Sequence, residues 1–221
     1  MESGLGEPPA RHVEYRARVT IEVQGQRSES IVRHVAEHLG GGWIRRSDHW
    51  YDGGASTSTY QERYLLHRNL LQVHQMRRVM APFVHDLLAE FGWLADTAQA
   101  QSVVTAGAFP QEEGSSISVG QMRVAATDPQ NLVPKETPYE RTIECRRDGV
   151  VEGSTLGSAL SGPLVRVSCR SMRSHLPGEA MNVYVWHPKS RMFLLVQARQ
   201  PTPFGGAETH TRQIETLSIT P

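Results

Sequence analysis

Apolar and polar residues alternate strictly over residues 13–23, near the start of the chain. A period of two residues is typical of a strand with one buried face. Gln24-Gly25-Gln26 then predicts a turn, because glycine adopts backbone conformations that other residues avoid. The apolar series is Val13, Tyr15, Ala17, Val19, Ile21 and Val23.

The spacing changes to that of a helix in residues 27–42. Apolar residues recur there at intervals of three to four and form one stripe. Ser28 or Ser30 can cap the start of such a helix, and three glycines from Gly40 favour its end. The pattern therefore predicts a strand, a turn and a short helix. The stripe consists of Ile31, Val32, Val35 and Leu39.

The predicted helix carries the motif H-x-x-E-H, formed by His34, Glu37 and His38. Two histidines four residues apart share one face of a helix. In inverted zincins this pattern binds zinc through the imidazoles, while the glutamate activates water. A catalytic zinc needs a third protein ligand, and no spacing rule selects one. The candidates are Glu112, Glu113, His49, Cys145 and Cys169; alternatively, both histidines only border the apolar stripe.

Two more helices are predicted in residues 59–92. Thr59 and Glu62 form a capping box for a helix that runs to about Met80, and Pro82 begins another that ends at Gly92. Before them, aromatic residues lie among basic ones, as is typical of a nucleic-acid or protein contact or of a loop anchored to a core. This cluster comprises Trp43, Trp50, Tyr51, Arg45, Arg46 and His49.

Residues 95–139 read mostly as a long loop, rich in Ala, Gln, Ser and Gly, with a short strand at 116–124. From residue 139 the period of two returns. Asp148-Gly149 favours a hairpin between 141–147 and 150–152. Further strands are predicted at 163–170, 181–187, 191–198 and 214–219.

These elements predict an α+β fold: an antiparallel sheet of about five to six strands with two or three helices packed on one face. Residues 1–12 are expected to form a disordered tail, and 13–221 a single domain with the long loop at about 95–139. The first strand is expected to join the C-terminal sheet, because an isolated strand leaves its hydrogen-bonding edges unpaired.

Composition narrows the function classes. The 221 residues carry 23 basic and 23 acidic side chains, so no strong overall field draws the chain to nucleic acid or anionic lipid. No apolar run reaches the roughly 18 residues of a transmembrane helix. Two cysteines are too few for a disulfide framework and fit a reducing compartment. The sequence lacks a phosphate-binding loop and a nucleophile elbow.

Two stretches resemble the matrix proteins of rhabdoviruses. One is the strand, turn and helix of residues 17–39, and the other is the pair of strands around a basic turn in residues 162–185. The resemblance implies a non-enzymatic protein that binds itself, the nucleoprotein and the membrane-associated glycoprotein tail during assembly and budding. It places the protein in the virion and in the host cytoplasm or at the inner membrane face. The acidic residues Glu2 and Glu7, and the lack of a PPxY motif, depart from that family.

The resemblance also selects the residues expected to make contacts. The basic candidates are Arg45, Arg46, Arg77, Arg78, Arg146, Arg147, Arg170 and Arg173, to which the cluster above adds Trp43 and Trp50. Two alternatives stay open. One is a zinc-dependent hydrolase or lyase with Glu37 as the catalytic residue and His34 and His38 as ligands. The other is a cytoplasmic α+β binding domain; it and the matrix protein require no cofactor.

Overall fold

The computed structural model describes residues 12–52, 60–67, 69, 71–79, 94–102, 114, 116–127, 137–173, 178–202 and 206–220. These residues form twelve strands and one short 3₁₀-helix, with no α-helix among them. The first six strands are β1 (His12–Val23), β2 (Gln26–Gly40), β3 (Trp43–Asp52), β4 (Tyr60–His67), β5 (Leu71–Val79) and β6 (Leu94–Ser102). The others are β7 (Ser116–Thr127), β8 (Thr137–Glu152), β9 (Pro163–Arg173), β10 (Glu179–His187), β11 (Met192–Pro201) and β12 (Ala207–Thr220), with η1 (Gly153–Leu156) after β8.

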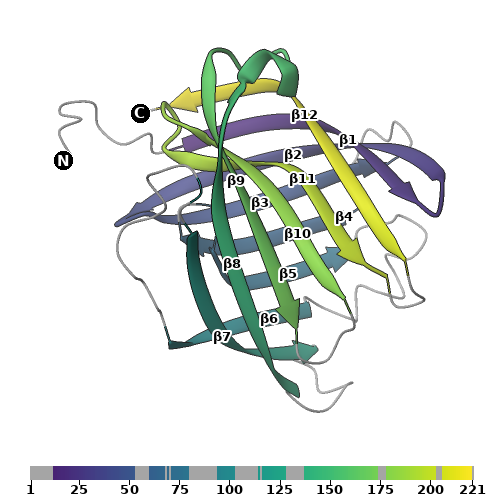
Figure 1. The fold of residues 1–221 in the computed structure, drawn as a ribbon, viewed down its shortest axis with the longest axis vertical. Helices are drawn as coiled ribbons and strands as arrows, with labels where there is room; N and C mark the ends of the chain where they lie inside the picture. Colours follow the sequence, from purple (N-terminus) through teal and green to yellow (C-terminus); the bar gives the residue numbers. More distant parts are fainter. Residues whose placement is uncertain are drawn as a thin grey trace.

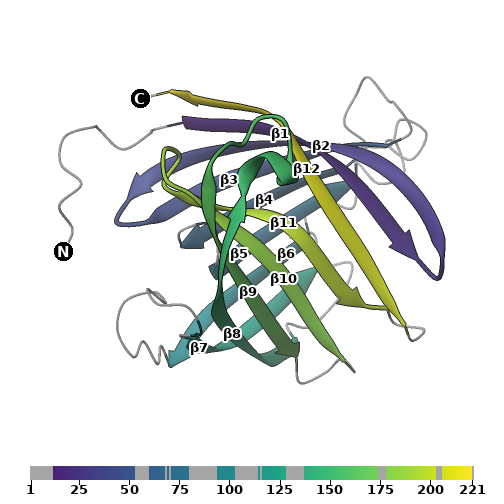
Figure 2. The ribbon, with the colours of Figure 1, turned by 45° about the horizontal axis from the view of Figure 1, so that its top comes forward.

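The strands form one antiparallel sheet that curls round on itself (Figures 1 and 2). Each strand pairs with its neighbours in sequence, and β1 also pairs with β12, which closes the described strands into a barrel. The strands from β8 to β12, followed by β1 to β4, make a continuous curled half-barrel. Strands β5 to β7 complete the ring, and four residue pairs join β5 to β6.

The predicted α+β fold is wrong. Residues 27–39, expected to be helical, lie in β2, and the helix expected to begin at residue 59 is replaced by β4 and β5. The helix expected at 82–92 lies outside the described residues. The expected loop at 95–139 contains β6, β7 and the start of β8. Strand β2 pairs along its length with β1 and β3, so pairing with both neighbours outweighs the local helical spacing.

Several local predictions are confirmed. Residues 13–23 form β1, which joins the C-terminal strand β12 as expected. Gln24 and Gly25 make the tight turn with φ of 51° and 80°. Strands β10 and β11 pair across residues 188–191. The hairpin expected at Asp148-Gly149 is wrong: β8 continues through it, and the register shifts between Arg147 and Gly149.

The inner face of the barrel holds most of the apolar core. Val13, Tyr15, Ala17 and Val19 of β1 are fully buried there, and Ile214 of β12 packs with them. Leu160, in the connection after η1, belongs to the same cluster. A second cluster joins β8, β9, β10 and β11, and its members are Ile143, Cys145, Val167, Cys169, Tyr184 and Phe193.

Cys145 of β8 and Cys169 of β9 lie directly opposite each other and form a disulfide, with their Cα atoms 4.0 Å apart. The structure therefore differs from the expectation of reduced cysteines. The bond also removes both thiols from the candidate zinc ligands, because a coordinating cysteine acts as a free thiolate.

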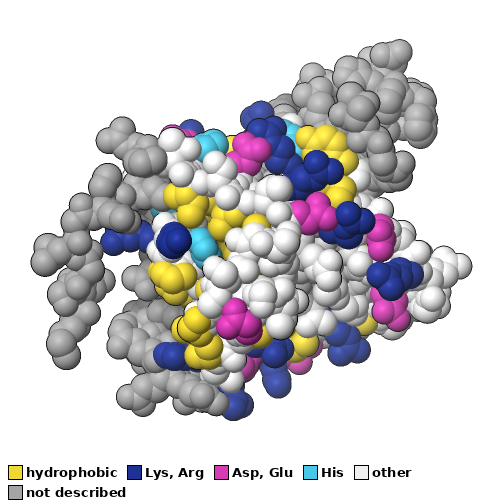
Figure 3. All heavy atoms as spheres, turned by 90° about the horizontal axis from the view of Figure 1, so that it is seen from above, with side chains coloured by type: hydrophobic (Ala, Val, Ile, Leu, Met, Phe, Trp, Pro, Cys, Tyr) yellow, Lys and Arg dark blue, Asp and Glu magenta, His cyan; other side chains and the backbone are white. Residues whose placement is uncertain are grey.

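The outer face carries charges of both signs, interspersed across the side seen in Figure 3. Strands β12, β1 and β2 contribute ion pairs there, such as Arg18 with Glu215 at 2.8 Å and Arg33 with Glu14 at 2.7 Å. Exposed pairs of this kind contribute little stability. They do leave this face without a patch of one sign, in keeping with the zero formal net charge.

Candidate functional site

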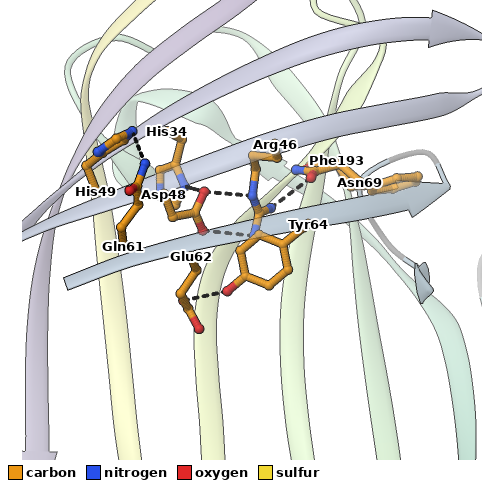
Figure 4. A network of polar contacts seen from close by, with 9 residues as sticks. All are labelled: His34, Arg46, Asp48, His49, Gln61, Glu62, Tyr64, Asn69 and Phe193. Atoms are coloured by element: carbon orange, nitrogen blue, oxygen red, sulfur yellow. Dashed lines mark hydrogen bonds and ion pairs between the residues drawn. The ribbon is translucent and has the colours of Figure 1, made fainter. Parts of the chain in front are cut away.

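A group of polar side chains lies inside the barrel on β2, β3 and β4 (Figure 4). Alternate residues of a strand point to the same face, and directly paired residues do so as well. His34 pairs with Asp48, Asp48 with Glu62, and Arg46 with Tyr64. His34, Asp48 and Arg46 expose 0%, 2% and 6% of their surface. The pairing thus gathers charged groups in the interior, where such residues are rare unless paired.

Asp48 is the centre of this network. Its Oδ1 accepts a hydrogen bond of 2.7 Å from His34 Nδ1, and its Oδ2 accepts one of 3.0 Å from Arg46 Nη2. Arg46 Nε lies 2.8 Å from Oδ1, and Arg46 Nη1 donates to Asn69 Oδ1 at 2.7 Å. Asn69 Nδ2 donates to the backbone oxygen of Phe193 at 2.6 Å, which connects the network to β11 on the other side of the barrel.

Burial and pairing act against each other in setting these charges. Burial alone would raise the pKa of Asp48, but Arg46 and His34 outweigh it and lower that pKa to about 2. Burial alone would lower the pKa of Arg46, but attraction to Asp48 holds it above its usual value. The pair is therefore fully ionised. Burial, with Glu62 beside it, raises the pKa of Tyr64, and the Tyr64 hydroxyl donates to Glu62.

His34 is neutral in this environment. Burial lowers its pKa to about 4, although Asp48 acts in the opposite direction. Because Nδ1 faces a carboxylate, Nδ1 carries the proton and Nε2 presents a lone pair. The ring stacks on Tyr15, with centroids 4.2 Å apart. His34 thus offers one hydrogen-bond acceptor to the interior in a fixed orientation.

Strand β12 adds a second polar group to the interior. Arg212 is 7% exposed, and its guanidinium lies 5.6 Å from the ring centroid of Trp50 on β3. His210 meets the same indole edge-on at 6.3 Å and hydrogen-bonds Glu208 through Nε2. The inward side chains of β12 thus become more buried from Glu208 to His210 to Arg212, and Ile214 is fully enclosed.

Several buried polar atoms of the inner face have no hydrogen-bond partner among the described residues. They include Tyr15 Oη, His34 Nε2, Arg147 Nε, Asn182 Oδ1 and Arg212 Nε. Buried polar atoms in folded proteins nearly always have a partner, and an unsatisfied one costs about 1–3 kcal/mol. These atoms comprise two guanidinium donors, two acceptors and one hydroxyl, which can donate or accept. Together they could bind a molecule that both accepts and donates hydrogen bonds.

The zinc hypothesis requires His34 and His38 to lie on one helix, but both residues lie in strand β2. In β2, four residues separate His34 from His38 by about 13 Å along the strand, too far for one ion. Glu37 points to the outer face, where it pairs with Arg45 at 3.2 Å. The described residues contain no group of three or more His, Cys, Asp or Glu side chains placed to hold a metal. Glu112 and Glu113 lie outside the described residues.

The residues selected for contacts are scattered. Trp43 and Arg45 are exposed on β3, whereas Arg46 and Trp50 point inward. Arg170 is exposed and lies 3.7 Å from Glu179. It lines an outer pocket of about 400 Å³ with Met181, Arg199 and Pro201, among others. Arg77, Arg78 and Arg173 belong to β5 and β9, and their side chains lie outside the description.

Sequence reasoning did not identify Asp48, Glu62, Tyr64 or Arg212 as site residues. One signal in the sequence could have revealed part of the site. In residues 44–50 and 62–66, every second residue has a large or charged side chain. In a closed sheet such an alternation places charges of opposite sign on one face. His34 was selected, but as a helical zinc ligand rather than as a partner of Asp48.

The comparisons with known proteins do not assign a family. No protein-family model and no curated protein matches the chain. A solved structure with some likeness is the hypothetical lipoprotein YmcC from Escherichia coli K12, with 9% identity, coverage of 90% of this chain and 83% of that one, and a TM-score of 0.42. That likeness is too distant to support a function. Within the described residues, no helix has the length and hydrophobicity to cross a membrane.

Proposed function

We propose that this protein is a non-enzymatic binding protein that holds a small polar molecule inside its barrel. The buried polar atoms without partners among the described residues carry this proposal, because they line the inner face with both donors and acceptors. The number of strands is compatible with it, because a closed ring of about eight or more strands can hold one small ligand.

The arrangement favours binding over catalysis. His34 and Asp48 resemble the base and the orienting group of a hydrolase, but Nε2 has no nucleophilic side chain as a partner in the described residues. Arg46 is committed to Asp48 and Asn69. These contacts fix the orientation of the interior groups, as a pre-organised binding site requires. The assembly function implied by the matrix-protein resemblance stays a prediction, without support from the comparisons.

A binding experiment tests the proposal. Native mass spectrometry of the purified protein would reveal a co-purified small molecule, and thermal unfolding with a panel of sugars, polyols and sugar acids would detect added ligands. We expect at least one compound to raise the unfolding temperature in a saturable way. Arg212→Gln should weaken this effect, whereas Arg18→Gln, on the outer face, should leave it unchanged. Failure of every compound, with no co-purified molecule, would contradict the proposal.

A further inference from the structure

The disulfide between Cys145 and Cys169 is buried in the folded chain. Cys145 is 1% exposed and Cys169 is 5% exposed. Ile143, Val167 and Phe193 belong to the same core cluster. Thiol–disulfide exchange requires direct attack on a sulfur atom, so an oxidant or a reductant needs access to it. A bond at this position therefore has to form before the strands pack around it.

The two cysteines also fix how β8 lies against β9. They are directly opposite each other in the register of the two strands, so the bond joins one defined pair of positions. A slip by one residue would turn one of the two side chains to the other face of the sheet. The register shifts further along β8, between Arg147 and Gly149. The bond thus holds β8 in place just before the point where its pairing becomes irregular.

Hydrophobicity specifies this register only weakly. In residues 141–147 of β8, the buried side chains are those of Ile143 and Cys145. Arg141 and Arg147, at the alternate positions on either side of them, are half-buried. Register is weakly specified where both faces of a strand are largely polar. A covalent link therefore adds a constraint that apolar burial does not supply.

We infer that this chain folds in an oxidising compartment, where the bond between Cys145 and Cys169 closes before the barrel packs around it. Disulfides form and persist in such compartments, whereas the reducing cytosol keeps thiols free. The bond forms by exchange with the disulfide of a thiol–disulfide oxidoreductase. The disulfide of that enzyme breaks, its two cysteines take up two electrons and two protons, and the two thiols of this chain give them up. The inference concerns where the chain folds and is independent of the ligand proposed above.

Thiol trapping in cells of the source organism tests the compartment. The cells are quenched in acid, free thiols are alkylated with a maleimide of high mass, and the chain is detected on a gel with an antibody. We expect no mass shift without reduction and a shift of two labels after reduction, because the chain has two cysteines and both are in the bond. A chain that carries labels without prior reduction would overturn the inference.

The rate of reduction tests whether the bond is enclosed. Dithiothreitol is added to the purified protein in buffer and in concentrated urea, and free thiols are counted by mass spectrometry. Reduction should be at least about a hundredfold slower in buffer, because the sulfur atoms become accessible only when the strands separate. Equal rates would show that an oxidant can also reach the cysteines after folding, which contradicts the proposed order of events.

A pair of substitutions tests what the bond contributes. Cys145→Ala with Cys169→Val removes the bond and keeps both positions apolar, and it should lower the unfolding temperature by about 5–15 °C. The matched control is Glu144→Gln with Arg170→Gln, an exposed pair directly opposite on the same two strands, which should cost less than about 3 °C. A cysteine variant as stable as the control would contradict the role of the bond in fixing β8. Failure of the cysteine variant alone to fold would be the expected result in stronger form.

Discussion

The buried histidine should make stability depend on pH. The folded-state pKa of His34 is about 4, below the usual histidine value of 6.5, so the unfolded chain binds the extra proton first. Stability is therefore fully present above about pH 6.5 and is lost as pH falls toward 4, by about 3 kcal/mol for this group. His34→Asn keeps a donor toward Asp48 but cannot titrate. Urea unfolding between pH 4 and 7 should show a shallower pH dependence in this variant than in the natural chain, and equal slopes would contradict the assignment.

Asp48 should contribute far more than any surface carboxylate. Asp48→Asn leaves Arg46 buried without its counter-charge, and breaking such a pair costs about 3–5 kcal/mol. Glu14→Gln is a fitting control, because it breaks an ion pair that is exposed on the outer face and should cost less than about 1 kcal/mol. Chemical denaturation measures both. Similar losses in the two variants would show that the interior network is solvated.

The connection between β8 and β9 packs closely on β12 at Gly157. Gly157 has φ of 146°, and a Cβ there would lie 2.2 Å from the backbone oxygen of Ile214. That oxygen also accepts a hydrogen bond from Ala159 N at 3.1 Å. Gly157→Ala should therefore move the connection off β12 and destabilise the protein by about 3 kcal/mol.

The control for this prediction lies five residues further on. Gly162 also has a positive φ, 71°, but a Cβ there would meet nothing within 4 Å. Gly162→Ala should cost only the backbone strain, about 1 kcal/mol. Thermal unfolding of the two variants distinguishes steric conflict from strain. A Gly162→Ala loss as large as that of Gly157→Ala would argue against close packing on β12.

The strands also show how much of the fold could be predicted from the sequence. Residues 13–23 were assigned correctly because their inner face is wholly apolar and their outer face polar, so the period of two is plain. In β2 the inner face includes Ser30 and His34, and outward positions hold Ile31 and Val35. Hydrophobicity then no longer follows the period of the strand, and the apolar residues fall by chance at helical spacing. A polar interior therefore concealed both the strand and the candidate site.

For the whole molecule, closure is the feature that matters most. In a closed barrel no strand exposes an unpaired edge, which removes the main route by which sheets associate. Twelve residue pairs join β1 to β12, and this seam lies between the two ends of the chain. This seam joins the two strands that are most distant in sequence. It could be expected because an unpaired strand edge needs a partner, but no local sequence pattern predicts it.

Removal of β12 should convert this closed sheet into an open one. A chain truncated after residue 206 loses Ile214 and Arg212 from the interior and exposes the edges of β1 and β11. Because exposed edges pair with other chains, we expect concentration-dependent aggregation, measured by light scattering beside the full-length protein. Addition of a synthetic peptide covering residues 207–221 should suppress it by restoring the seam. A truncated chain that stays monomeric with an unchanged circular dichroism spectrum would show that β1 and β12 do not close the barrel.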